Sequence, residues 1–68
     1  MKAQEFQSWC SAMKLETAGD SAQELGAARN TGQIWFALAR EGKDVPIKRT
    51  TALVMSALYH RLDEWRAP

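Results

Sequence analysis

The sequence has one cysteine, Cys10, and one histidine, His60, among its 68 residues. A single cysteine excludes an intramolecular disulfide, and the two residues are too few to ligate a structural zinc ion. No apolar run approaches the roughly 20 residues of a membrane-spanning helix. The N-terminus also lacks the order of charged, apolar and small residues that marks a signal peptide. We therefore expect a cytoplasmic protein with no metal, no cofactor and no membrane partner.

The alternating polarity of β-strands, internal repeats and low-complexity segments are also absent. No nucleophile and base are spaced as a catalytic set. His60 lacks such a partner and is expected at the surface or in an interface, and the acidic pair Asp63-Glu64 is not a placed dyad. We expect no enzymatic activity.

Hydrophobic side chains are plentiful: they make up 46% of the residues and include three Trp. That is enough for one small helical core, although a domain near this size buries only about 60% of the surface that its unfolded chain exposes. We expect a single domain over residues 1–68, with Trp9, Trp35 and Cys10 packed inside it. So small a core favours stabilisation by a second copy.

Apolar residues recur at helical spacing in the first half of the chain. They predict a helix over about 3–14, whose buried stripe comprises Phe6, Trp9, Cys10 and Met13. A second helix of about two turns follows. It opens on Thr17 and Asp20, which resemble a capping box, and ends at Gly26, which can adopt a positive φ. Its small residues allow a neighbouring helix to approach closely.

The second half of the chain predicts two more helices. The first spans about 28–40, with an inward stripe that comprises Thr31, Ile34, Trp35 and Leu38, and Gly42 ends it in a left-handed cap. Pro46 closes a polar connection and suits the first turn of the next helix, which we expect over about 47–65 as the longest of the four. The apolar surface of that helix exceeds what one small core needs, so a further contact is expected to cover it.

The tight turn between the second and third helices is the most informative feature of the sequence. Arg29, Asn30 and Gln33 fall on the first turns of the third helix, and their side chains can form paired hydrogen bonds with base edges in a major groove. Arg29 suits guanine O6 and N7, whereas Asn30 and Gln33 suit adenine N6 and N7. Ala28 and Ile34 are candidates to touch thymine methyl groups, and Ile34 equally suits the edge of the core. The same polar residues also fit an ordinary solvated helix face, which is the commoner role of such a pattern.

The net charge is only +1, but it is unevenly distributed. Residues 28–61 carry six basic side chains against two acidic ones, whereas the segments on either side are net negative. A basic middle of this kind can steer a chain toward phosphates. Candidates to contact the DNA backbone are donors at helix ends and in adjoining loops. They are Ser21, Gln23, Thr31, Arg40, Lys43, Lys48, Arg49 and Thr50.

Over residues 17 to about 38 the chain resembles the helix-turn-helix domains of small phage and bacterial regulators of the Cro/repressor type. That pattern has a small residue in the second helix, an apolar-Gly pair at the turn and a bulky apolar anchor about nine residues later. Here these are Ala22, Leu25-Gly26 and Trp35. Residues 45–53 extend the likeness to the tail of short regulators in this group, including those encoded beside anti-CRISPR genes. The resemblance implies a compact four-helix bundle that represses transcription by binding an inverted-repeat operator as a homodimer.

Three residues depart from that pattern. Gly32 stands where the family has a buried Val or Ile, Ala28 replaces the serine that usually caps the third helix, and Ala27 is smaller than the usual Val. A glycine inside a helix costs about 1 kcal/mol relative to alanine, and a missing N-cap side chain costs about the same. We expect the two changes to lower stability and to loosen this part of the protein.

We interpret the chain as a sequence-specific DNA-binding repressor that is autoregulatory and homodimeric. The fourth helix is expected to supply the dimer contact, through Met55, Leu58, Tyr59, Leu62 and Trp65. The leading alternative is a small helical protein-interaction module, such as a phage inhibitor whose exposed apolar helix binds a host protein. The near-neutral total charge fits that alternative better than it fits a DNA-binding protein.

Overall fold

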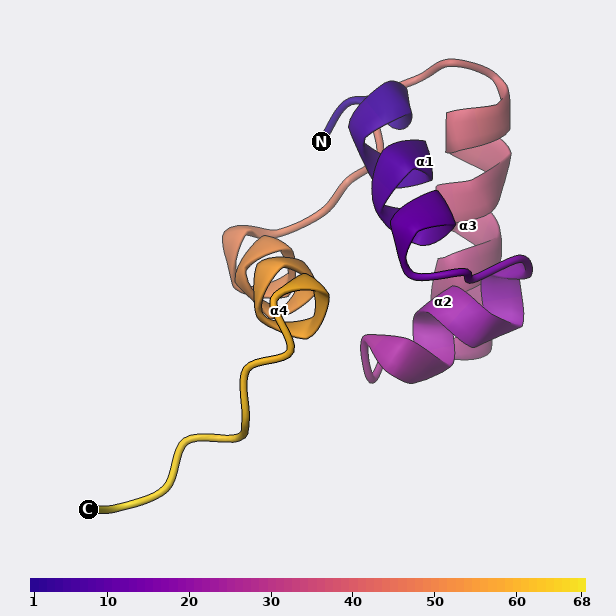
Figure 1. Cartoon of the computed structure of the whole chain (residues 1–68). Coiled ribbons are helices and arrows are strands. Elements are labelled where there is room, and N and C mark those ends of the chain that lie inside the picture. Colours follow the sequence, from indigo (N-terminus) through magenta and orange to yellow (C-terminus); the bar gives the residue numbers. More distant parts are fainter.

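The protein consists of four α-helices and contains no β-strand. The computed structural model describes all 68 residues and contains α1 (Ala3–Ala12), α2 (Ala18–Glu24), α3 (Arg29–Arg40) and α4 (Arg49–Tyr59). Both α2 and α1 pack on α3, and α4 lies against α1 (Figure 1). The all-α prediction is confirmed. None of the four helices has the length and apolar character that crossing a membrane requires.

The core lies mainly between α1 and α3. Phe6 packs edge to face on Trp35, with ring centroids 6.1 Å apart, and on Phe36, at 5.8 Å. Trp9, Trp35 and Cys10 are all buried, as predicted. The Cys10 thiol is desolvated there, which raises its pKa to about 11 and keeps it neutral at ordinary pH.

Hydrogen bonds attach the second half of the chain to α1 and to the residues before it. The Trp9 Nε1–H donates to the Met55 backbone oxygen at 2.9 Å, which holds α4 against α1. In the preceding connection, Val45 is almost fully buried and its N–H donates to the Met1 backbone oxygen at 2.7 Å. Because buried polar groups need a partner, the Trp9 bond fixes which turn of α4 faces the core.

All four helices end in the hydrogen-bond pattern of the Schellman motif, in which one residue adopts a left-handed conformation. The next residue in each motif donates its N–H to the carbonyl five residues earlier, at 2.8–2.9 Å. After α2 and α3 the left-handed residue is Gly26 (φ 67°) or Gly42 (φ 74°), as predicted. After α1 and α4 it is Lys14 (φ 58°) or Arg61 (φ 56°), and the sequence pattern missed both.

The predicted boundaries of α1 and α4 are therefore corrected. α1 stops two residues earlier than expected, and α4 covers 49–59 instead of 47–65. With 11 residues against 12 in α3, α4 is not the longest helix, and Pro46 lies outside its first turn. Leu62 and Trp65 belong to a tail without secondary structure, which makes the protein 44 Å long and about 20 Å wide.

Replacing Lys14 with Gly should raise the free energy of unfolding by about 0.5–1 kcal/mol, because a left-handed conformation strains a residue that has a Cβ. Gly26→Ala should lower it by about 1 kcal/mol. A Cβ at Gly26 would meet no atom within 4 Å, so the backbone conformation is the only source of that cost. Urea denaturation followed by circular dichroism measures both changes. A shift of the same sign in the two variants would contradict the assigned motifs.

Candidate nucleic-acid interface

α2, the turn and α3 form one structural unit. The Thr17 hydroxyl caps α2 by accepting a hydrogen bond from the Asp20 N–H at 3.1 Å. Gly26 then ends α2, and α2 lies across the N-terminal part of α3 (Figure 1). The predicted turn is confirmed, and so is the cap by Thr17, but the reciprocal bond of a capping box, from the Thr17 N–H to the Asp20 side chain, is not formed.

Gly32 is buried where α2 and α3 meet. A Cβ at this position would collide with the Ala18 carbonyl oxygen and lie 2.8 Å from the Ala22 Cβ, closer than real Cβ contacts. The two backbones therefore approach this closely only because Gly32 has no side chain. The expectation that Gly32 loosens this region is corrected, since the glycine is what lets the two helices pack.

One face of α3 is open to solvent. At 100° per residue, its exposed positions fall within about 140° of the helix circumference. They are Arg29, Asn30, Gln33, Ile34, Ala37 and Arg40. Trp35 and Ala39 bury the opposite side. Ile34 is 53% exposed and belongs to the open face, so of the two positions left open by the sequence the exposed one is correct and the inward one is wrong.

The predicted base-reading side chains are free of internal partners. Arg29, Asn30 and Gln33 make no side-chain hydrogen bond or ion pair within the chain. The first N–H groups of α3, like those of any α-helix, lack an intrahelical partner. Ala28 is exposed at the N-cap and provides no side chain to accept from them. Hydrogen-bonding capacity is thus concentrated on the first two turns of α3.

The predicted phosphate contacts near these turns have different environments. Gln23 lies beside Arg29, because both line a shallow hollow on the α2–α3 surface. Asp20, considered from sequence only as part of the cap, lines the same hollow. Thr31 is half-buried. Ser21 is fully buried and its hydroxyl donates to a backbone oxygen of α2 at 2.9 Å, so it is removed from the set that can reach a phosphate.

The remaining predicted phosphate contacts lie away from the first turns of α3. Arg40 is at the other end of the helix, roughly 16 Å from Arg29 along its axis. Lys43 forms an exposed ion pair with Glu41 at 3.2 Å. Lys48, Arg49 and Thr50 are exposed around the start of α4, which packs against α1 (Figure 1). The basic middle of the sequence is therefore dispersed over the surface.

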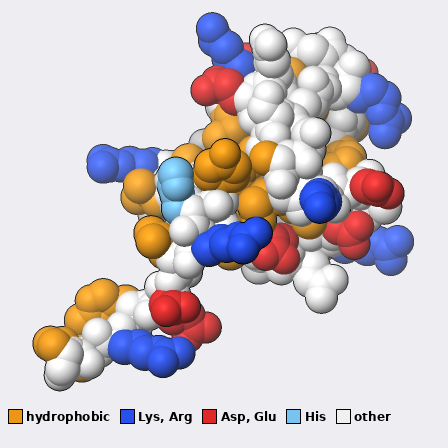
Figure 2. Space-filling view, in the orientation of Figure 1, with side chains coloured by type: hydrophobic (Ala, Val, Ile, Leu, Met, Phe, Trp, Pro, Cys, Tyr) orange, Lys and Arg blue, Asp and Glu red, His pale blue; other side chains and the backbone are white.

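The residues predicted for a dimer contact are also dispersed. Met55 is only 3% exposed and belongs to the core, so it is corrected from an interface residue to a core residue. Leu58 packs partly against the same core, while Tyr59 is exposed and packs edge to face on His60. Leu62 and Trp65 extend along the tail, where hydrophobic side chains are exposed (Figure 2).

No protein-family model matches the sequence, and no curated protein or solved structure is significantly similar to it. No group of three or more His, Cys, Asp or Glu side chains is placed to hold a metal ion.

Gly32→Ala should lower the free energy of unfolding by about 1–3 kcal/mol, because overpacking outweighs the gain of about 1 kcal/mol in helix propensity. Gly19→Ala in α2 is the matched control. A Cβ there meets only the Thr17 Oγ1, at 3.9 Å, so this variant should be as stable as the parent or slightly more stable. Thermal and urea denaturation measure both. Equal stability of the two variants would show that the close contact does not matter.

Proposed function

We propose that the chain is a helix-turn-helix repressor of the Cro/repressor type that binds double-stranded DNA in the major groove. The observation that carries this proposal is the open face of α3, where Arg29, Asn30 and Gln33 lie together without internal partners directly after a glycine turn. A major groove about 12 Å wide admits an α-helix, and one good bidentate base contact provides about 1–3 kcal/mol of discrimination. Ile34 adds an exposed apolar group suited to a thymine methyl.

We further propose that two copies, each a compact helical bundle, bind an inverted-repeat operator. A twofold axis would place two α3 helices in successive major grooves, about 34–36 Å apart. Contacts to the DNA backbone would come from Gln23 and the uncapped start of α3, with the cations of the connection and α4 adding long-range attraction. A dimer bound at the operator of its own gene would block transcription of that gene.

Selection from a random pool of DNA duplexes, followed by gel shifts at low salt, tests the DNA-binding function. The expected product is an inverted repeat with half-sites one helical turn apart. The triple variant Arg29→Ala, Asn30→Ala, Gln33→Ala is the control, because all three side chains are exposed and their loss leaves the core intact. Binding without sequence preference, or equal enrichment by the control, would count against base reading by α3.

Arg29→Ala and Lys48→Ala should affect DNA binding differently. Arg29→Ala should cost about 1–3 kcal/mol at one or two operator positions, because it removes a base contact. Lys48→Ala should weaken binding to all sequences alike and reduce the slope of log K against log salt by less than the value of about 1 that a direct phosphate contact contributes, because Lys48 acts at long range. Lys2→Ala, at the exposed residue that precedes α1, controls for the loss of one positive charge. Titrations at several salt concentrations give these slopes, and equal losses on all sequences from Arg29→Ala would place Arg29 among the phosphate contacts.

A second candidate function is favoured by Leu53, Val54 and Tyr59, which expose apolar surface on α4. A small helical module that binds a host protein would use such a face and would need no affinity for DNA. Salt elution from heparin or DNA-cellulose separates the two functions, since only the repressor should be retained at low salt.

A further inference from the structure

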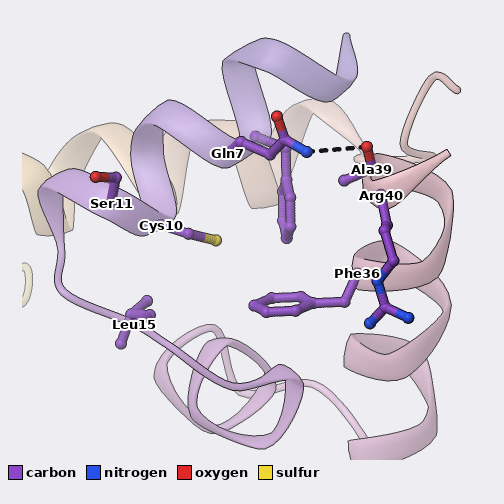
Figure 3. A pocket seen from close by; sticks show the side chains of 8 residues that line it. Gln7, Cys10, Ser11, Leu15, Phe36, Ala39 and Arg40 are labelled. Atoms are coloured by element: carbon purple, nitrogen blue, oxygen red, sulfur yellow. Dashed lines mark hydrogen bonds between the residues drawn. The ribbon is translucent and has the colours of Figure 1, made fainter. Parts of the chain in front are cut away.

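An apolar groove of about 360 Å³ lies between α1 and α3. Phe6, Cys10, Leu15 and Phe36 provide most of its apolar lining (Figure 3). At one end, the Gln7 side-chain amide donates to the Ala39 backbone oxygen at 2.9 Å and thereby joins α1 to α3. The thiol of Cys10 is neutral because burial raises its pKa, so it contributes to the groove as an apolar group.

Arg40 supplies the positive charge at the rim of this groove. The Arg40 and Phe36 side chains both come from α3 and line the same side of the groove (Figure 3). Arg40 is exposed and forms no ion pair within the chain. The groove therefore combines the aromatic rings of Phe6 and Phe36 with the unpaired cation of Arg40. Such a site suits an aromatic side chain accompanied by a carboxylate.

The tail at 62–68 carries such a combination. Trp65 is 85% exposed, more than any other large hydrophobic side chain of the protein, and it directly follows Asp63 and Glu64. An aromatic side chain of this size buries about 150–250 Å² when it finds a partner. Nothing in the same chain covers Trp65.

We propose that the groove receives Trp65 from a second copy of the chain, with Asp63 or Glu64 pairing with Arg40. By twofold symmetry each copy gives its tail and accepts that of its partner, so the dimer contains two identical docking sites. This inference rests on the homodimer of the proposed function and specifies the residues that hold it together.

The position of α4 favours the partner's tail over the chain's own. The end of α4 lies beside Ala12 and Met13, where Arg61 lines the same surface hollow. From there the tail runs away from α1 and α3 (Figure 1), and it leaves Trp65 in solvent. In this conformation the chain's own groove stays open to the tail of a second copy.

Sedimentation equilibrium of the full chain without DNA tests this dimer. Trp65→Ala should raise the dimer Kd by about tenfold or more, as expected for loss of a central aromatic contact. Ser11→Trp should do the same by filling the groove from an exposed position of α1, whereas Ser8→Trp, which is exposed on α1 outside the groove, should not. Circular dichroism checks that each variant is folded. Unchanged Kd values in folded Trp65→Ala and Ser11→Trp would overturn the proposal.

Two combinations make the test specific. Arg40→Glu should weaken dimerisation, and adding Asp63→Lys and Glu64→Lys in the same chain should restore most of the loss, because the charges are exchanged. A mixture of Trp65→Ala, which keeps an open groove, and Ser11→Trp, which keeps an intact tail, should form a heterodimer with one docking site. Absence of both the charge rescue and the heterodimer would show that Trp65 does not dock in a partner's groove.

Binding to a duplex that contains a single half-site separates this inference from the proposed function. Trp65→Ala should bind the half-site as tightly as the parent chain and lose only its preference for the full inverted repeat. If the parent dimerises through the groove but binds no half-site, the DNA-binding function fails while the docking site stands. If it binds the half-site but Trp65→Ala dimerises normally, the docking site fails alone.

Discussion

The contact between the backbones of α2 and α3 at Gly32 determines how the proposed DNA-binding face is presented. Because Gly32 has no side chain, α3 lies directly on Ala18 and Ala22 of α2. Trp35, less than one turn later, packs on Phe6 of α1. These two attachments bury one side of α3 and leave its other side open to solvent. A larger residue at position 32 would push the helices apart and change the direction in which that open side faces.

The ends of the helices also determine the path of the chain, because a left-handed residue terminates each helix. All four use the same hydrogen-bond pattern, but only Gly26 and Gly42 adopt the left-handed conformation without steric cost. Lys14 and Arg61 adopt it with a Cβ, which indicates that the hydrogen bonds and the packing around them compensate for local strain. The stop at Arg61 also releases the last residues of the chain from α4 and leaves Trp65 in solvent.

The two proposed surfaces occupy different parts of the molecule. Base reading is assigned to the first two turns of α3, whereas the groove proposed to receive Trp65 is formed by α1 and the C-terminal half of α3. Exchange of tails would therefore occupy Arg40 and leave the first two turns of α3 free for DNA.

The sequence by itself determined the number of helices, the turn at Gly26, the burial of Trp9 and Trp35 and the exposure of Arg29, Asn30 and Gln33. Each of these follows from helical periodicity or from the conformational freedom of glycine, which are local properties. Only the tertiary structure decided that Ser21 and Met55 are buried, that Ile34 is exposed and that α2 leaves no room for a Cβ at position 32. Those outcomes depend on which helix lies opposite each residue, and on helix ends at Lys14 and Arg61 that no glycine marks.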